Sequence, residues 1–233
     1  LLEDRVLPRK EKNSMKYDVI IIGAGPGGIF AAYELLQHTE GLRIAVFEAG
    51  HELAKRRCPI DGEKIKSCIG CKSCSIMSGF GGAGAFSDGK FNLGTAYGGT
   101  MGEELGEDLA MYYINQVDSI LEQFADDYPP MYHSNEELKL KCLQNNLRLL
   151  DMNVRHLGTD KNFDTMQSLI DALEEKGVEM RDLTEVLEIE KMDGCYAVSH
   201  RRGSREAEVL QASKILISTG RSGSDFVIRT CKK

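Results

Sequence analysis

A glycine-rich turn between an apolar run and an amphipathic stretch constrains the fold of this chain more than any other feature. The turn is Gly23-Ala24-Gly25-Pro26-Gly27-Gly28, and the apolar, β-branched run Tyr17–Ile22 before it is typical of a buried parallel strand. Pro26–His38 follows with helical spacing, and Arg43–Phe47 has the composition of a second buried strand. A strand–helix–strand unit of about 30 residues is the size of one crossover. The sequence therefore predicts an α/β fold that begins with a Rossmann-like unit.

The turn has the G-x-G-x-x-G pattern of dinucleotide-binding sites, in the context that such a site requires. Gly23 permits the tight turn, Gly25 allows a pyrophosphate to approach the backbone, and Gly28 allows close packing of helix and strand. The helix that opens at Pro26 directs its first N–H groups and its positive dipole end at the phosphates. Glu48, twenty residues beyond Gly28, is placed to accept hydrogen bonds from a ribose. The alternative is a glycine turn in an ordinary βαβ unit.

The pattern after Gly177 changes to strands, which we expect over residues 178–181, 184–191, 195–200, 206–211 and 214–218. The last of them runs into Thr219-Gly220-Arg221-Ser222-Gly223 after an antiparallel meander. This resembles the second glycine motif of glutathione-reductase-like flavoproteins, which favours FAD over NAD. The resemblance implies that Thr219, Gly220 and the backbone of Val186 contact the cofactor.

Ten of the 24 glycines lie between Gly79 and Gly106, a density that no helix interior or central strand tolerates. The string Ser78–Lys90, preceded by Arg56-Arg57-Cys58-Pro59, resembles the bacterial FAD-dependent dehydrogenases, and the resemblance extends from about Met15 to Arg229. It implies a cofactor site that includes Arg56, Arg57, Gly81, Gly82, Gly84, Ser87 and Lys90. The alternative is a flexible linker, but the interleaved aromatic side chains argue against it.

Three helices are expected between these parts, over Glu103–Asp126, Asn135–Leu150 and Asn162–Lys176, with Asn135 as the cap of the second and Asp160 or Asn162 as the cap of the third. The domain boundaries follow. Residues 1–14 form a disordered tail, 15–100 and 177–233 a discontinuous FAD-binding domain with a parallel sheet and an antiparallel β-meander, and 101–176 a helical insertion.

Four of the seven cysteines are clustered as Cys58-x9-Cys68-x2-Cys71-x2-Cys74. This spacing suits a [4Fe–4S] cluster or a tetrahedral zinc site. A dithiol that exchanges with the flavin, or reduced and metal-free thiols in a loop, explain it equally well.

Lys90 and His156 are weak candidates for a catalytic role. His156 lies in the string Arg155–Asp160, which is part of the resemblance, and an imidazole beside a flavin can transfer a proton. A structural histidine is the simpler reading for His156.

Composition excludes several classes of function. A net charge of −7 gives no field that attracts nucleic acid or an anionic membrane. No apolar run reaches the roughly 18 residues of a membrane span, and no signal-peptide pattern is present. Seven cysteines in such a chain argue for reduced thiols, so a cytoplasmic location is expected.

The function expected from these features is that of an FAD-dependent oxidoreductase of unknown substrate, with a reduced nicotinamide, NAD(P)H, or an iron–sulfur partner as donor. One alternative is an electron-transfer or redox-sensing module in which the cysteines matter and no small molecule is reduced. Another is a non-catalytic nucleotide-binding fragment. No late strand with Gly-Asp closes the flavin site after Gly223, so the fold is expected to be incomplete at the C-terminus and the chain to be a fragment that is inactive alone.

Overall fold

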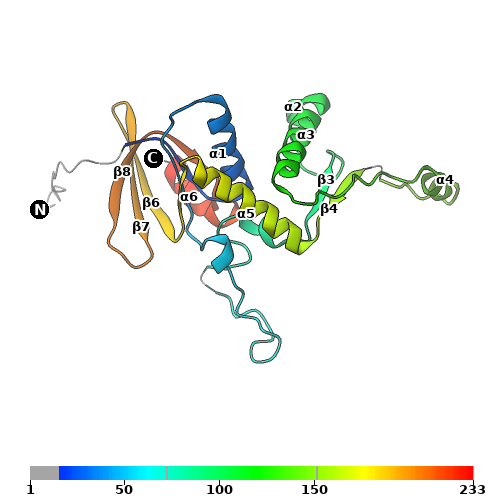
Figure 1. The fold of residues 1–233 in the computed structure, drawn as a ribbon, viewed down its shortest axis with the longest axis horizontal. Helices are drawn as coiled ribbons and strands as arrows, with labels where there is room; N and C mark the ends of the chain where they lie inside the picture. Colours follow the sequence, from blue (N-terminus) through cyan, green and yellow to red (C-terminus); the bar gives the residue numbers. More distant parts are fainter. Residues whose placement is uncertain (1–15, 72, 151, 233) are drawn as a thin grey trace, which may run out of the picture. The chain divides into compact units, whose positions relative to one another are not determined.

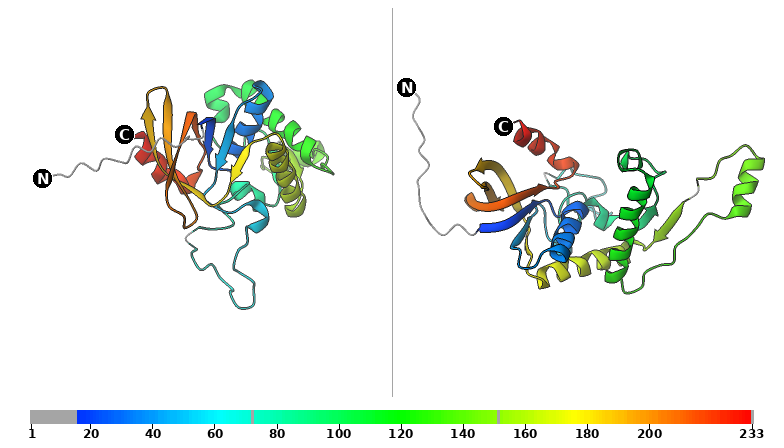
Figure 2. Two further views of the ribbon diagram at one scale, coloured as in Figure 1. Left: turned by 60° about the vertical axis from the view of Figure 1, so that its left-hand side comes forward. Right: turned by 90° about the horizontal axis from the view of Figure 1, so that it is seen from above.

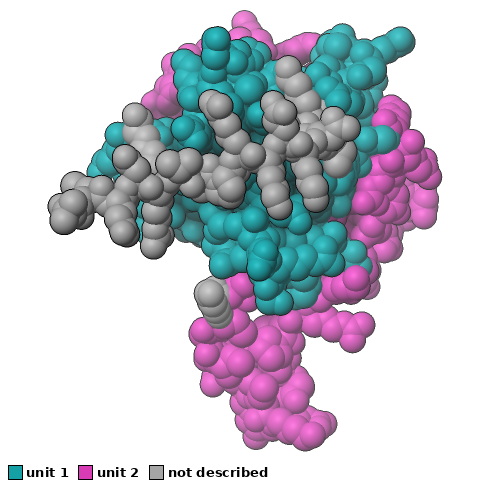
Figure 3. Space-filling view, turned by 90° about the vertical axis from the view of Figure 1, so that its left-hand side faces the viewer, with its two compact units in different colours: residues 1–52, 177–233 teal, residues 53–176 magenta. Residues whose placement is uncertain are grey.

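A computed structural model describes residues 16–71, 73–150 and 152–232, so the expected disordered tail, residues 1–14, lies outside the described residues. The chain divides into two compact units (Figure 3). The first comprises Leu1–Glu52 with Gly177–Lys233, and the second comprises Leu53–Lys176. Residues 53–100, expected in the FAD-binding domain, thus cluster with residues 101–176. The helical insertion is the larger part of the second unit.

The first unit contains a six-stranded sheet in the order β5-β2-β1-β8-β7-β6 (Figure 1). Its elements, in chain order, are β1 (Lys16–Ile22), α1 (Pro26–His38), β2 (Ile44–Phe47), β5 (Glu179–Arg181), β6 (Thr184–Met192), β7 (Cys195–Arg202), β8 (Glu208–Ile217), a 3-10 turn (Arg221–Gly223) and α6 (Ser224–Cys231). Strands β5, β2, β1 and β8 are parallel, whereas β8, β7 and β6 form the antiparallel meander. The α/β class with a parallel sheet and a β-meander is therefore confirmed.

Strand β8 belongs to both parts of this sheet. The sequence predicts two strands, over 206–211 and 214–218, but the structure has one strand, Glu208–Ile217. Ala212 pairs with Tyr17 of β1 on one side and with Tyr196 of β7 on the other, and its side chain is fully buried. Pairing with β1 on one side and with β7 on the other holds the backbone extended at this point, so the strand continues through it.

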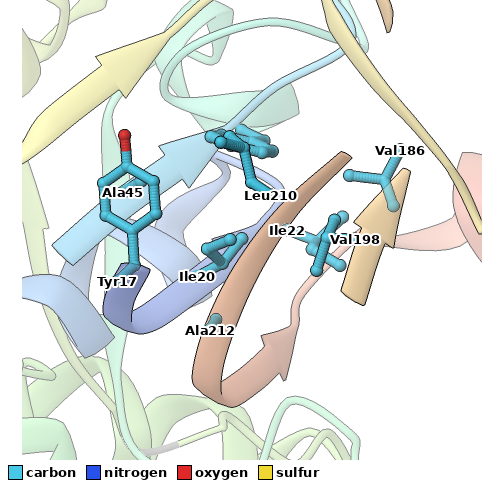
Figure 4. Packing of buried hydrophobic residues seen from close by; sticks show 9 residues of the cluster. Tyr17, Ile20, Ile22, Ala45, Val186, Val198, Leu210 and Ala212 are labelled. Atoms are coloured by element: carbon cyan, nitrogen blue, oxygen red, sulfur yellow. The ribbon is translucent and has the colours of Figure 1, made fainter. Parts of the chain in front are cut away.

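Both faces of β1 are covered, as its unbroken apolar sequence requires. Ile20 and Ile22 point to one face, where they pack with residues of β2 and of all three meander strands (Figure 4). Ile21 points to the other face, toward Gly28 of α1.

His200 of β7 is a buried polar residue in the same unit. Its ring stacks on Phe47 at 5.1 Å, its Nε2 lies 3.4 Å from a terminal nitrogen of Arg181, and its Nδ1 has no hydrogen-bond partner among the described residues. The residue lines a charged cavity of about 240 Å³. Burial lowers the pKa of His200 below its ordinary value of 6.5, and the positive charge of Arg181 lowers this pKa further.

This environment predicts that acid destabilises the fold through His200. In the unfolded chain His200 binds a proton near pH 6.5, whereas in the folded chain its lowered pKa keeps it neutral to a lower pH. The free energy of unfolding is therefore highest above about pH 6.5 and decreases as the pH falls toward the lowered pKa. Denaturant unfolding of the wild type and of His200→Gln, between about pH 7.5 and about 5.5, measures the effect. We expect a shallower pH dependence for His200→Gln; parallel curves would contradict the assignment.

The second unit combines helices with a two-stranded antiparallel ribbon. Its elements are two 3-10 helices (Leu53–Lys55 and Gly82–Phe86), β3 (Lys90–Leu93), α2 (Met101–Leu105), α3 (Glu107–Phe124), α4 (Glu136–Gln144), β4 (Asn153–His156) and α5 (Thr159–Glu175). Strand β3 pairs with β4, and α3 and α5 are the amphipathic helices that bury apolar side chains. Figure 2 shows α4 extending from the ribbon, away from α3 and α5. No described helix is long and apolar enough to cross a membrane.

The boundaries of the three predicted helices need correction. The first is divided into α2 and α3 at Gly106, whose φ of 83° is not helical. The second ends at Gln144, just before Asn146 adopts a left-handed φ of 56°; its predicted cap is confirmed, since the Asn135 side chain accepts from the Leu138 N–H. The third begins at Thr159, after Gly158, so neither Asp160 nor Asn162 is its cap.

Candidate functional site

The carboxyl ends of β8, β1 and β2 carry the predicted dinucleotide residues of the first unit. The parallel ladder continues just past the strands, because Ser218 N donates to Ile22 O at 2.7 Å and Gly23 N donates to Phe47 O at 2.7 Å. The glycine turn after β1 therefore lies between the residues that follow β2 and those that follow β8. In open α/β sheets this edge, outside the carboxyl ends of the strands, is where ligands bind.

Close approach of the backbone explains why glycine is required at two positions of the turn. A Cβ on Gly23 would lie 2.3 Å from Ser218 O, and φ at Gly23 is +105°. A Cβ on Gly28 would lie 1.9 Å from Gly23 O. Helix α1 thus starts directly against the turn. Its N-cap is Gly25, which has no side chain that could cap the first N–H groups of the helix. Pro26 occupies the first helical position, and the first turn contains no acidic residue. This arrangement fits the phosphates of a dinucleotide.

Glu48 lies at the glycine turn, as the sequence predicts. One of its carboxylate oxygens accepts from Ala24 N at 3.0 Å and the other accepts from Gly50 N at 2.9 Å. The two bonds fix a half-buried carboxylate beside the turn, and a carboxylate oxygen has capacity for a second donor. A ribose hydroxyl is a donor of the right kind.

Of the residues predicted from the second half of the unit, two lie after a strand and one lies on a strand. Thr219 and Gly220 follow β8, and the Thr219 hydroxyl is buried without a hydrogen-bond partner among the described residues. Val186 lies on β6, the outermost strand, next to an irregularity in its pairing with β7. Its side chain packs in the core, which leaves only its backbone for a ligand.

Arg56 is buried in the second unit, with 3% of its surface exposed. Its guanidinium donates to four backbone carbonyls, those of Ser75 (2.8 Å), Ile76 (2.8 Å), Phe80 (2.5 Å) and Gly82 (2.8 Å). It also lies over the Phe86 ring, 4.5 Å from the centroid. The side chain therefore organises the glycine-rich segment from within, whereas Arg57 beside it is exposed.

The glycine-rich segment is ordered, and α5 holds it. A Cβ on Gly81 would lie 2.7 Å from Ala85 Cβ, and the Ser87 hydroxyl donates to Gly84 O at 2.8 Å. Asn162, buried in α5, donates to Gly84 O at 2.8 Å and to Ala85 O at 3.3 Å. Sequence reasoning treated Asn162 only as a helix cap, and no local signal marks it as a partner of residues nearly 80 positions earlier.

Lys90 and His156 come together although 66 positions separate them in the sequence. They pair directly across the β3–β4 ribbon, and both are exposed. Opposed residues of an antiparallel pair have Cβ atoms about 5 Å apart. A buried ion pair fixes the neighbouring residue: Arg155 Nε lies 2.9 Å from Asp118 Oδ1, which also accepts from the Tyr128 hydroxyl.

The four clustered cysteines are accessible. Cys58, Cys68 and Cys71 are exposed and Cys74 is half-buried, and all four are free thiols. Among the described residues, no three Cys, His, Asp or Glu side chains come together as a metal site in this conformation.

Comparison with known sequences finds short stretches of similarity. Residues 17–71 match the family "Pyridine nucleotide-disulphide oxidoreductase". A stretch of 39 residues is 56% identical to thiamine thiazole synthase from Thermotoga maritima, covering 17% of this chain and 15% of that protein.

Solved structures share the fold over most of the chain. The 3-ketosteroid-delta4-(5alpha)-dehydrogenase from Rhodococcus jostii RHA1 superposes with a TM-score of 0.57 at 16% identity, over 92% of this chain and 48% of that one. Glycine oxidase from Geobacillus kaustophilus gives a TM-score of 0.52 at 15% identity, over 92% of this chain and 58% of that one. The chain thus spans about half the length of these proteins. Their architecture confirms the Rossmann-like α/β fold.

Proposed function

We propose that this chain is the FAD-binding part of an FAD-dependent oxidoreductase. One observation carries the proposal: the Glu48 carboxylate is held 3.0 Å from Ala24 N, inside the glycine turn. An acidic residue after the second strand, brought to the glycine turn, is the arrangement that binds the adenosine ribose and pyrophosphate of a dinucleotide. The family match and the flavoprotein fold support FAD over NAD as that dinucleotide.

The residues of the first unit divide the work of binding. The glycine turn and the first N–H groups of α1 hold the pyrophosphate, and Glu48 holds the adenosine ribose. Thr219 and Gly220 lie at the same edge, and the backbone of Val186 is proposed to face the adenine. Bound FAD supplies hydride or electron transfer, and the protein supplies position and electrostatics. A reduced nicotinamide is the proposed electron donor, in keeping with the name of the matched family.

Replacing Glu48 tests this proposal. Glutamine has one carbonyl oxygen where Glu48 has two, so Glu48→Gln loses an acceptor for one backbone N–H and the charge-assisted bond to the ribose. We expect FAD affinity to fall by about 10- to 100-fold, since a hydrogen bond to a charged group is worth about 1.5–3 kcal/mol. Flavin fluorescence titration measures it, with the exposed Glu40→Gln as the matched control. Equal affinities for both variants would sink the proposed role.

The exposure of Cys58, Cys68 and Cys71, with Cys74 half-buried beside them, favours a second candidate function. In this alternative the protein passes electrons or senses redox state through a metal or dithiol at Cys58, Cys68, Cys71 and Cys74, and reduces no small molecule. Both zinc and an iron–sulfur cluster are candidates for the metal. Serine variants of these cysteines separate the two functions. If the thiols have no redox role, the variants of the complete oxidoreductase keep their substrate turnover. If the thiols pass electrons or sense redox state, the variants lose that activity.

A further inference from the structure

The cysteines lie in a loop whose two ends are joined by one side chain. Arg56 donates from Nε to Ser75 O and from a terminal nitrogen to Ile76 O, each at 2.8 Å, so residues 57–74 form an excursion closed at its base. Figures 1 and 2 show this segment extending from the rest of the second unit. Cys58 is two positions after Arg56, and Cys74 is one position before Ser75. Two of the four thiols are therefore held at the base of the loop.

Few contacts fix the conformation of the described residues of this loop. Its described residues include no helix or strand, and all of them are exposed except Ile65 and Cys74. In its described part, the Asp61 carboxylate accepts from the N–H groups of Glu63, Lys64 and Ile65 in a local turn, and Cys74 O at the base accepts from Met77 N and Ser78 N. Loops longer than about 12–15 residues without secondary structure are uncommon in compact domains, and those that occur are usually binding loops or linkers.

The spacing of the thiols favours an iron–sulfur cluster over zinc. Three cysteines at C-x2-C-x2-C, completed by a remote cysteine that precedes proline, is the ligand set of a bacterial ferredoxin cluster. Here Cys68, Cys71 and Cys74 form the run, and Cys58-Pro59 is the remote pair. Structural zinc sites more commonly draw their cysteines from two separated pairs. The ten positions from Cys58 to Cys68 span up to about 35 Å, which is enough for the run to fold back to the base of the loop.

The charge of the loop also favours an iron–sulfur cluster. A [4Fe–4S]²⁺ core with four thiolates carries two negative charges. The sequence of the loop holds four cations (Arg57, Lys64, Lys66 and Lys72) against two carboxylates (Asp61 and Glu63), in a chain whose net charge is −7. The thiols are not gathered in this conformation, as is usual for sites whose assembly is coupled to metal binding.

We propose that Cys58, Cys68, Cys71 and Cys74 ligate a [4Fe–4S] cluster that closes the 57–74 loop. The inference rests on the second candidate function, whose metal it specifies, and it is independent of the FAD proposal because the ligands and the base of the loop belong to the second unit alone.

Anaerobic reconstitution of the purified chain with ferrous iron and sulfide tests the proposal. After desalting we expect about four iron and four sulfide per chain, a visible absorption that dithionite bleaches, and an electron paramagnetic resonance signal from the reduced protein. Cys68→Ser and Cys71→Ser are expected to lose most of the bound iron, by about fivefold or more. Cys142→Ser and Cys195→Ser, which alter cysteines outside the loop, are the matched controls.

Three outcomes would overturn the cluster. These are no retained iron in the wild type, full retention in Cys68→Ser, or tight binding of one zinc per chain that excludes iron. FAD uptake measured on the same samples keeps the two proposals apart. An intact cluster without FAD uptake contradicts only the proposed function, and FAD uptake without iron contradicts only the cluster.

Discussion

Gly28→Ala is expected to abolish tight FAD binding and to destabilise the first unit by about 3 kcal/mol. The added Cβ would lie 1.9 Å from Gly23 O, and Gly23 in turn cannot retreat because the Ser218 carbonyl lies against it. Helix α1 must therefore move away from the turn and carry its N–H groups out of reach of the phosphates. We expect FAD affinity to fall by at least about 100-fold, which is about 2.7 kcal/mol. Denaturant unfolding and flavin fluorescence measure the two effects.

Gly27→Ala is the matched control for this substitution. Its Cβ would lie 2.7 Å from Ser218 Oγ, a side-chain atom that can rotate away, and no backbone atom is near. The expected change in stability is within about 0.5 kcal/mol. Equal destabilisation by the two alanines would show that close backbone approach is not what demands glycine at position 28.

Arg56→Ala is expected to have a comparable effect on the second unit. The substitution leaves four carbonyls of residues 75–82 without their donor and removes the cation from the Phe86 ring. A hydrogen bond to a charged group is worth about 1.5–3 kcal/mol, so the loss of four such bonds is expected to cost at least about 3 kcal/mol. We also expect faster hydrogen exchange at residues 75–86, because the guanidinium is what ties them together. Arg56→Lys rescues little, since an ammonium cannot span the four acceptors.

Arg57→Ala tests separately the two arginines, Arg56 and Arg57, that the family resemblance places together in the cofactor site. Arg57 is exposed, so its loss is expected to change stability by less than about 0.5 kcal/mol. If Arg57 contacts the cofactor, as the family resemblance implies, FAD affinity falls while the fold is unaffected. Substantial unfolding in Arg57→Ala, or none in Arg56→Ala, would contradict the division of roles.

Local sequence signals predicted the first unit well where one physical requirement dominates. The glycine pattern predicted the turn at Gly23, the helix Pro26–His38 and the position of Glu48. It could do so because the backbone of the turn is packed so closely at Gly23 and Gly28 that no side chain fits there. The sequence could not predict that β8 is one continuous strand, because Ala212-Ser213 has no strand signal of its own. Two neighbouring strands, β1 and β7, impose the extended conformation there.

The second unit was less predictable because its order depends on contacts distant in sequence. The β3–β4 ribbon is four residues per strand, too short for a periodic signal, yet it is what brings Lys90 opposite His156. Asn162 holds the glycine-rich segment from 77 and 78 positions away. Proximity of Gly81, Gly82, Gly84, Ser87 and Lys90 to a flavin stays a prediction from the family resemblance.

Equilibrium titration of the purified chain with FAD tests the central claim most directly. Flavin fluorescence follows binding, and circular dichroism confirms that the protein in the cuvette is folded. The account predicts saturation at about one FAD per chain, with weaker binding by Glu48→Gln and almost none by Gly28→Ala. A folded wild-type chain that takes up no FAD at any concentration, or that binds it equally well in all three forms, would contradict the assignment of the glycine turn and Glu48 as the dinucleotide site.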